Sequence, residues 1–222
     1  MTVPFSDFSV SSPVRPFARL YEGMGKRLLD LMLVLLAAPV AVPLVGLILF
    51  ATWREGGRPL YVQHRIGRGG QLFRCWKVRT MVQDADVVLA QLIGGDPALA
   101  DEWHLNQKLS RDPRITRLGR FLRRTSLDEL PQLWNVLNGT MSLVGPRPFT
   151  PEQQGLYAGG HAAAYYRLRP GLSGLWQVSR RNSGSFSERV AYDDEYSRQI
   201  SLWGDAVILW RTVLVVLRAT GI

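Results

Sequence analysis

Residues 31–52 read LMLVLLAAPVAVPLVGLILFAT, and no charged side chain interrupts them. The run is long enough to cross the hydrocarbon core of a bilayer as a helix. Pro39 and Pro43 lie in its middle, and each removes one helical backbone hydrogen bond. We therefore expect a membrane helix that breaks near Pro39.

Both flanks of this run are basic, through Arg15, Arg19, Lys26 and Arg27 before it and Arg54, Arg58, Arg65 and Arg68 after it. Because Lys and Arg mark the cytoplasmic side of a membrane, two basic flanks favour a segment that enters, bends and returns. A kinked transmembrane helix is the alternative. A signal peptide is less favoured, since the run continues past the small residues Ala37-Ala38.

These observations divide the chain into three parts. Residues 1–20 have no clear periodicity and are predicted to be a loose tail. Residues 21–54 are predicted to form the re-entrant membrane helix. Residues 55–222 remain as a domain on the cytoplasmic face.

Within that domain, short apolar-polar runs at 60–66 and 72–78 surround Gly67-Arg68-Gly69-Gly70 and predict a β-hairpin. Ala85 to Ile93 is predicted to be a short helix that ends at two glycines. Asp112-Pro113 is a good start for a basic amphipathic helix, which suits either a membrane surface or a solvated face. Residues 202–218 fit an interfacial or a core helix. The fold class is therefore α+β, mostly helical, and monotopic.

The chemistry is concentrated in residues 125–148, TSLDELPQLWNVLNGTMSLVGPRP. Asp128 and Glu129 follow a run of arginines, and carboxylates beside many cations suggest chemistry on phosphates. Pro131 fits only the first turn of a helix, so the sequence predicts a helix start with Asp128 as its N-cap. A helix N-terminus favours an ionised carboxylate and can also hold a phosphate.

Composition limits the alternatives. The 222 residues carry a net charge of +9, and only three of the 27 basic residues are lysines. This arginine bias favours bidentate contacts to phosphate. The single cysteine, Cys75, excludes an intrachain disulfide and a Cys-rich zinc site, and we expect it to be a small buried residue.

Several ordered motifs resemble those of the bacterial monotopic phosphoglycosyl transferases, the sugar transferases that start polysaccharide assembly on undecaprenyl phosphate. The matching motifs cover almost the whole chain after the tail: Lys26-Arg27-Leu28-Leu29-Asp30, Gln63-His64-Arg65-Ile66-Gly67, Lys77-Val78-Arg79-Thr80-Met81, Asp112-Pro113-Arg114-Ile115-Thr116, the block from Ser126 to Pro148, Pro170 to Val178, and the tail that contains Asp205.

The resemblance implies transfer of a sugar 1-phosphate from a UDP-sugar to undecaprenyl phosphate, with release of UMP, as the first membrane step of exopolysaccharide assembly. It implies that Asp128 is the nucleophile and forms a covalent phosphosugar, that Glu129 assists, and that Mg²⁺ bridges the diphosphate near Asp128. The physics agrees, because a dianionic donor repels a carboxylate until cations neutralise it.

Phosphate recognition is expected from cationic residues that match family positions or stand beside them, namely Lys77, Arg79, Arg123 and Arg147. Two prolines stiffen the backbone around Arg147. Lys77 and Arg79 would share one face of a strand and grip one diphosphate together. Arg123 precedes Asp128 by five residues, so a loop could aim both at one phosphorus.

Two features depart from the usual family pattern. Ser179-Arg180-Arg181 stands where members often have Ser-Gly-Arg, which would alter the sugar or acceptor end of the site. The short tail suggests the compact form of the family. The region from Trp176 to Tyr192 looks closer to members that use UDP-galactose or UDP-glucose.

The alternative class is a basic membrane-associated protein that binds anionic lipid or nucleic acid. It gives no reason for an Asp-Glu pair beside a Gly-Pro-Arg-Pro turn. We therefore expect UDP-sugar, undecaprenyl phosphate and membrane lipid as partners at the cytoplasmic face of the bacterial inner membrane, and no nucleic acid. Homodimer formation is left open.

Overall fold

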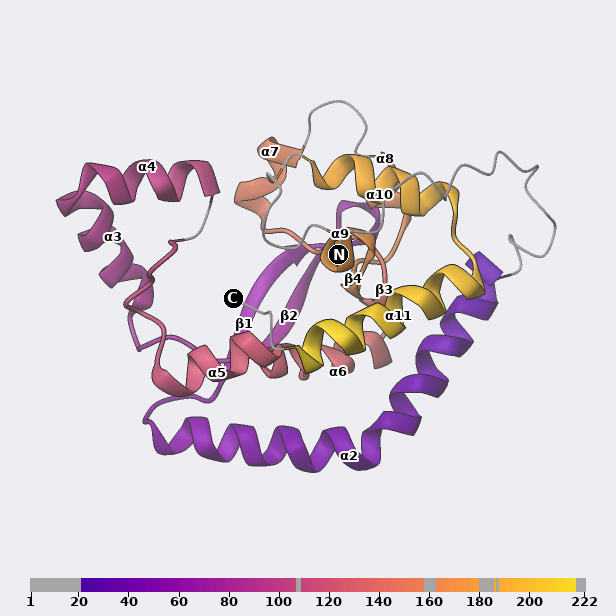
Figure 1. The fold of residues 1–222 in the computed structure, drawn as a ribbon, viewed down its shortest axis with the longest axis horizontal. Helices are drawn as coiled ribbons and strands as arrows, with labels where there is room; N and C mark the ends of the chain where they lie inside the picture. The colour runs from indigo at the N-terminus through magenta and orange to yellow at the C-terminus, as the bar shows by residue number, and fades with distance from the viewer. Residues whose placement is uncertain (1–20, 107–108, 158–162, 180–185, 187, 219–222) are drawn as a thin grey trace.

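The computed structural model describes residues 21–106, 109–157, 163–179, 186 and 188–218. The predicted tail, residues 1–20, and Arg180-Arg181 lie outside these residues. The described chain is mostly helical, as expected (Figure 1). After a short π-helical turn, its helices are α2 (Lys26–Arg54), α3 (Ala85–Gly95), α4 (Pro97–Asn106), α5 (Arg117–Thr125), α6 (Gln132–Leu137), α7 (Gln154–Tyr157), α8 (Ala163–Arg167), α9 (Leu175–Ser179), α10 (Arg189–Arg198) and α11 (Leu202–Leu217).

Two small sheets complete the fold. Strands β1 (Leu60–Ile66) and β2 (Leu72–Val78) form the predicted antiparallel hairpin, with the register running from Leu60 opposite Val78 to Ile66 opposite Leu72. Strands β3 (Ser142–Val144) and β4 (Gly171–Ser173) pair in parallel, which the sequence did not predict. Each of these two strands has three residues, too few for a periodic pattern to be visible.

Helix α2 contains both prolines of the apolar run and changes direction along its length (Figure 1). This is the bend that prolines inside a helix are expected to cause. Between Tyr21 and Arg54 the helix is apolar enough to cross a membrane, and only 17% of its most apolar stretch is buried. Its exposed side chains include large apolar ones: Leu35, Leu36, Val40, Val42, Leu47 and Phe50. These features are compatible with monotopic membrane association.

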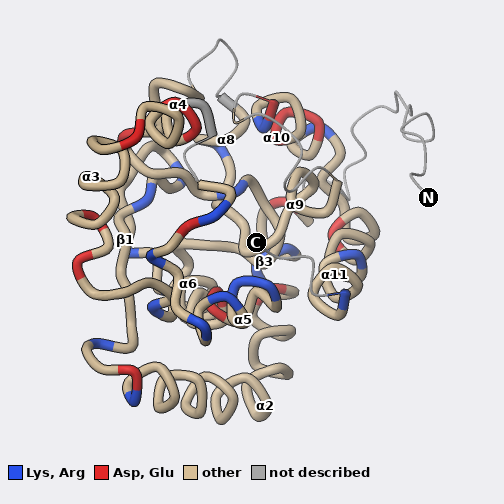
Figure 2. Tube along the Cα trace, turned by 60° about the vertical axis from the view of Figure 1, so that its left-hand side comes forward, with Lys and Arg blue, Asp and Glu red and all other residues tan. Residues whose placement is uncertain are grey.

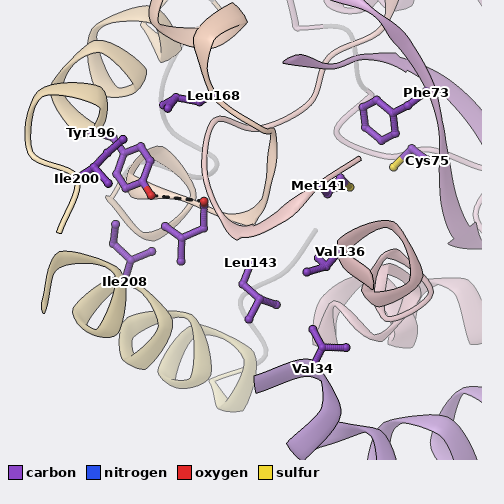
Figure 3. Packing of buried hydrophobic residues seen from close by; sticks show 11 residues of the cluster. Val34, Phe73, Cys75, Val136, Met141, Leu143, Leu168, Tyr196, Ile200 and Ile208 are labelled. Carbon is purple, nitrogen blue, oxygen red and sulfur yellow. Dashed lines mark hydrogen bonds between the residues drawn. The ribbon is translucent and has the colours of Figure 1, made fainter. Parts of the chain in front are cut away.

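The two halves of α2 pack on the rest of the molecule in different places. Val34, in the first half, belongs to the main core with Val136 of α6 and Leu143 of β3 (Figure 3). Ile48, in the second half, packs with Val78 and with Leu122 of α5. The helix is therefore held to the folded domain on both sides of its prolines.

Helices α5 and α11 both carry exposed apolar side chains. Phe121 of α5 is 52% exposed, and Trp203 and Trp210 of α11 are 78% and 65% exposed. Arginines occupy positions 117, 120, 123 and 124 of α5 (Figure 2). This is the amphipathic pattern predicted from the sequence, and it suits helices that lie in a membrane interface.

Helix α5 begins four residues later than the sequence predicted. Its N-cap is Thr116, whose hydroxyl accepts a hydrogen bond from the Gly119 N–H at 2.9 Å. Asp112 does not cap a helix, because its carboxylate binds the Arg114 guanidinium at 2.6 Å. A Cβ on Gly119 would lie 2.0 Å from the carbonyl oxygen of Thr80, so only glycine lets α5 approach this close. The close approach sets α5, and Arg123 on it, beside the end of β2.

Candidate active site

Glu129 gathers the cations of the site. Its Oε1 accepts a hydrogen bond from Lys77 Nζ at 2.9 Å and another from Arg147 Nη2 at 3.0 Å. Burial alone would raise the pKa of Glu129, but the charges of Lys77 and Arg147 outweigh burial and hold the pKa well below its usual range. Glu129 is therefore ionised at neutral pH and fixes both cations in place.

Asp128 is the neighbour of Glu129 in sequence but has a different environment. Its side chain is buried, and in the described part of the chain no hydrogen bond or ion pair ends on its carboxylate. Burial raises its pKa, the charge of Glu129 raises it further, and Lys77, Arg123 and Arg147 only partly oppose this rise. Asp128 thus keeps a carboxylate whose oxygens are free for an incoming group.

The local backbone explains how the pair comes to lie here, and it corrects the predicted cap. Ser126 adopts a left-handed conformation (φ 58°), and a 3₁₀ turn, Leu127–Glu129, follows it. Helix α6 begins only at Gln132, with Pro131 as the residue before it. Asp128 is therefore not the N-cap of α6, and in the described chain its carboxylate accepts no hydrogen bond from a backbone N–H group.

The four predicted phosphate-binding residues separate into two groups. Lys77 on β2 and Arg147 after β3 meet at Glu129, and Arg123 on α5 is close enough to Asp128 for the two charges to interact. Arg123 is oriented by a 2.8 Å hydrogen bond from its Nε to Thr80 Oγ1. The three residues thus lie around the carboxylate pair.

Arg79 has other contacts. Its Nη2 donates to the carbonyl oxygen of Thr52 at 3.2 Å and to that of Gly56, both at the end of α2. Lys77 binds Glu129 instead, so the side chains of Lys77 and Arg79 do not share a partner in this structure. These contacts tie Arg79 to the end of α2 and to the turn that follows it.

A small pocket of about 10 Å³ lies at Glu129, lined by Arg65, Cys75, Lys77, Glu129, Gln132, Arg147, Pro148 and Gly171. Such a volume holds about one water molecule. Cys75 is buried, as predicted, and burial raises the pKa of its thiol. Arg65 was not predicted as a site residue, although it belongs to the Gln-His-Arg-Ile-Gly motif. Its position opposite Phe73 turns it to the same sheet face as Cys75 and Lys77.

A larger cavity of about 350 Å³ lies elsewhere, between the start of α2 and residues 167–169, and it shares no lining residue with the small pocket. Two of the four cations that line it are in ion pairs, and Arg169 Nε donates to the carbonyl oxygen of Gly139 at 2.9 Å. Lys26 binds Asp205 at 2.5 Å, and Arg167 lies 3.8 Å from Glu22. Neither Asp128 nor Glu129 lines this cavity, so its larger size does not make it the reactive centre.

The donor set can be tested against a metal ion. The described residues contain no group of three or more His, Cys, Asp or Glu side chains that could hold a metal by themselves. Mg²⁺ differs from most metals in this respect, because it is usually held by one or two carboxylates together with substrate phosphates. The unpaired carboxylate of Asp128 fits that mode, whereas Glu129 is already bound to two cations.

Comparison with known proteins decides the family. The sequence model of the family described as bacterial sugar transferase matches residues 21–219. This chain belongs to that family. The match includes α2, the hairpin, the carboxylate pair and α11, so the bacterial sugar transferase resemblance drawn from the motifs is confirmed.

Three relatives place the chain within the bacterial sugar transferases. The UDP-galactose-lipid carrier transferase of Erwinia amylovora is 46% identical over 196 residues, which are 88% of this chain and 41% of the relative. The exopolysaccharide production protein ExoY of Rhizobium meliloti is 42% identical over 219 residues, 98% of this chain and 95% of the relative. The UDP-glucose:undecaprenyl-phosphate glucose-1-phosphate transferase of Caulobacter vibrioides is 38% identical over 218 residues, 95% of this chain and 76% of the relative. The chain thus spans about two fifths of the Erwinia protein and nearly all of ExoY.

Proposed function

We propose that this protein transfers a hexose 1-phosphate from a UDP-sugar to undecaprenyl phosphate, releases UMP, and forms a covalent phosphosugar on Asp128 on the way. The observation that carries the proposal is the asymmetry of the carboxylate pair. Glu129 is bound to two cations, whereas the buried Asp128 beside it has no partner in the described chain. The names of the relatives, which act on undecaprenyl phosphate or on UDP-sugars, support the same reaction.

In the first step an oxygen of Asp128 attacks the phosphorus that carries the sugar. A bond from Asp128 to this phosphorus forms, and the bond from the phosphorus to the bridging oxygen breaks, so that UMP leaves with that oxygen. Lys77 has N–H groups beyond the one it gives to Glu129, and so does Arg147. These groups stabilise the charge that develops on the phosphate oxygens.

In the second step an oxygen of undecaprenyl phosphate attacks the same phosphorus. The new P–O bond gives the polyprenyl diphosphate sugar, and the carboxylate of Asp128 leaves unchanged. A covalent route lets one small site serve a soluble donor and a membrane acceptor in turn.

Asp128 is the residue that would hold Mg²⁺, together with oxygens of the donor diphosphate. The ion would neutralise the diphosphate and act as a Lewis acid on it. This chain would contribute the carboxylate of Asp128, which is buried beside Glu129 and has no partner in the described chain. The raised pKa of Asp128 makes such a cation useful, since positive charge next to the carboxylate favours its ionised form.

The site lies on the cytoplasmic face of the bacterial inner membrane in this proposal, and α2 enters the bilayer and returns. The basic residues on both sides of the apolar run support this orientation. The exposed apolar side chains of α2 and α11 would contact lipid. Labelling of cysteines placed at each end of α2 tests the topology, because access to the two ends from opposite sides of the membrane would contradict it.

The test of the reaction is a panel of UDP-sugars with undecaprenyl phosphate and Mg²⁺, read out as UMP release and as lipid-linked sugar. UDP-galactose and UDP-glucose are the expected donors. The relatives are named for both sugars, so the panel also decides between the two. Binding of anionic lipid without UMP release from any donor would favour the binding-protein alternative.

A further inference from the structure

The larger cavity, of about 350 Å³, lies apart from the carboxylate pair, which does not line it. Pockets for small molecules typically measure about 300–1,000 Å³, so this cavity is large enough to hold a ligand. Its lining joins the start of α2, the turn of the β1–β2 hairpin, β3, the residues between α8 and β4, and α10. The charged residues of the lining are four cations and two acids, namely Lys26, Arg68, Arg167, Arg169, Glu22 and Asp30.

The cations of this cavity differ in whether an acid neutralises them. Lys26 and Arg167 are in the two ion pairs given above. Arg68 and Arg169 belong to none of the ion pairs in the described chain. The carboxylate of Asp30 accepts a hydrogen bond from a backbone N–H of β3 at 3.0 Å. Two guanidinium groups therefore remain against this one carboxylate, and the lining keeps a surplus of positive charge.

The two unpaired arginines are held differently. Arg169 Nε donates to the carbonyl oxygen of Gly139, and the terminal nitrogens of its half-buried guanidinium have no partner in the described chain. Arg68, on the hairpin turn, is exposed, and no hydrogen bond in the described chain involves its side chain. Burial lowers the pKa of Arg169, and the positive charges of Arg68 and Arg27 lower it further, because like charges lie close together.

Guanidinium groups bind anions through parallel N–H donors, which match the oxygens of a phosphate or a carboxylate. Arg169 offers such donors in a fixed position, since its Nε is already anchored. Arg68 lies on a short exposed turn, so its long side chain can adjust to a bound anion. The lining thus fits an anion that bridges the two arginines, and the surroundings of the cavity indicate which anion this is.

The cavity lies at the level at which α2 enters the membrane in the proposed topology. Lys26 and Asp30, which line it, directly precede the uncharged run of residues 31–52. The Lys26–Asp205 ion pair joins this end of α2 to the first turn of α11, and Figure 1 shows the two helix starts side by side. In that turn Trp203 is 78% exposed, and exposed tryptophans are typical of the membrane–water interface. The anion that is abundant at this level is the phosphate of membrane lipids.

We propose that the larger cavity binds the phosphate group of a membrane phospholipid between the guanidinium groups of Arg68 and Arg169. The bound phosphate joins the hairpin turn to the segment before β4, beside the start of α2, and so helps to hold the membrane helix on the folded domain. The inference rests on the membrane placement of α2 in the proposed function and is independent of the transfer reaction.

The experiment titrates the full-length protein in detergent with phosphatidylglycerol and counts bound lipid by native mass spectrometry. The variants are Arg68→Gln and Arg169→Gln. Arg74→Gln is the matched control, because Arg74 is an exposed arginine of the same hairpin that lines neither cavity. Each cavity variant should bind the first phosphatidylglycerol about tenfold more weakly or worse, as for loss of one charge-assisted hydrogen bond, and the control should match wild type. Phosphatidylglycerol should also raise the melting temperature of wild type more than that of Arg68→Gln.

Two soluble or lipid-like probes identify the source of the phosphate. Glycerol 3-phosphate, which has no acyl chains, should bind at least tenfold more weakly than phosphatidylglycerol, and diacylglycerol, which has no phosphate, should not distinguish Arg68→Gln from wild type. Equal affinity for glycerol 3-phosphate would assign the cavity to a soluble phosphate and overturn the lipid. Tighter binding of undecaprenyl phosphate that is lost in Arg68→Gln would assign it to the acceptor and would also overturn the inference.

Unchanged phosphatidylglycerol affinity in Arg68→Gln would overturn the proposal as a whole. This variant is expected to fold, because the side chain of Arg68 makes no hydrogen bond in the described chain, so it decides the matter even if Arg169→Gln does not fold. An equal loss of affinity in Arg74→Gln would also overturn the proposal, since the lipid would then respond to overall charge. Failure of the membrane placement is distinguishable, because wild-type protein would then not associate with vesicles of any composition.

Discussion

Two buried carboxylates, Asp205 and Asp128, show how the same chemical group serves different ends in this molecule. Asp205 accepts hydrogen bonds from Tyr21 at 2.6 Å, Lys26 at 2.5 Å and Tyr196 at 2.8 Å. Asp128 is also buried, yet the structure gives it no such partner in the described chain. The satisfied carboxylate joins α11 to the start of α2 and to α10. Asp128, with no such bond in the described chain, keeps its oxygens open to an incoming group.

Burial alone does not identify a reactive acid. A buried charge with a full set of donors stabilises a fold only modestly compared with apolar packing, but it is costly to break. A buried charge without donors raises the free energy of the folded state and persists where it is useful. On this basis Asp205 holds the architecture, and Asp128 is the candidate nucleophile.

The largest expected effect is that of Asp128→Asn. The substitution keeps the shape of the side chain and removes the nucleophilic oxygen charge, so transfer and covalent labelling by the donor should both be abolished. Intact-mass measurement after incubation with UDP-sugar and Mg²⁺, without acceptor, checks the adduct directly. The melting temperature should not fall, because no hydrogen bond to Asp128 is lost in the described structure. If labelled phosphosugar still attached to the variant, Asp128 would not be the attacking group.

The next effect is expected for Arg147→Ala. Arg147 is one of the two cations at Glu129, and its loss removes a positive charge that would face the transferred phosphate in the proposed reaction. By analogy with an oxyanion-hole donor, the loss should cost about 2–4 kcal/mol of transition-state stabilisation, or about 30- to 1000-fold in turnover.

A matched control for Arg147→Ala is Arg79→Ala, whose described contacts are at the end of α2. It should affect turnover much less and stability more. Steady-state kinetics and thermal unfolding of both variants check this prediction. Near-normal kinetics in a well-folded Arg147→Ala protein would remove Arg147 from the site.

Asp205→Asn tests the other half of the comparison. The side chain of Asp205 is 1% exposed and that of Lys26 is 13% exposed, so the substitution leaves a buried ammonium without its counter-ion. A loss of about 3–5 kcal/mol of stability is expected, which is the range for breaking a buried ion pair. Denaturant unfolding measures it. The turnover of the protein that remains folded should stay close to that of wild type, and a selective loss of turnover at full stability would reverse the assignment.

The sequence predicted those parts of the fold that have local signals. The β1–β2 hairpin has the predicted bounds, because two seven-residue runs surround a cluster of glycines. Helix α11 ends within one residue of its predicted end. The start of α5 was wrong because Asp112 binds a side chain instead of capping a helix. The start of α6 was wrong because a 3₁₀ turn stands before it.

The candidate site was predictable to a similar extent. Asp128, Glu129, Lys77 and Arg147 follow from the motifs, and the structure brings them together. That Glu129 takes both cations and leaves Asp128 unpaired depends on side-chain geometry between distant elements, for which a sequence has no periodic signal. The environment of Arg189 is of the same kind. The two rings against Arg189 belong to Trp176 of α9 and to Phe186. No sequence pattern distinguishes Arg189 from the other arginines of the chain.

The smallest expected effect concerns Asp193, a third buried carboxylate, which has an intermediate environment. It accepts a hydrogen bond from the Tyr157 hydroxyl, and burial raises its pKa from 3.8 to about 7. Because the pKa in the folded state lies above the ordinary value, the protonated form stabilises the fold. This contribution is fully present below about pH 4 and is lost as the pH rises through 7. The lowered pKa of Glu129 has the opposite effect on stability. Its contribution is present at neutral pH and is lost only as the pH falls into the acidic range.

Asp193→Asn should therefore unfold with a weaker dependence on pH than wild type between pH 5 and 8. Asparagine keeps an acceptor for the Tyr157 hydroxyl and cannot ionise, so the variant gains in melting temperature relative to wild type as the pH increases. Thermal unfolding at four pH values in this range measures the difference. Parallel curves for the two proteins would mean that Asp193 titrates normally. Asp193 would then be a full counter-ion for Arg189 at neutral pH.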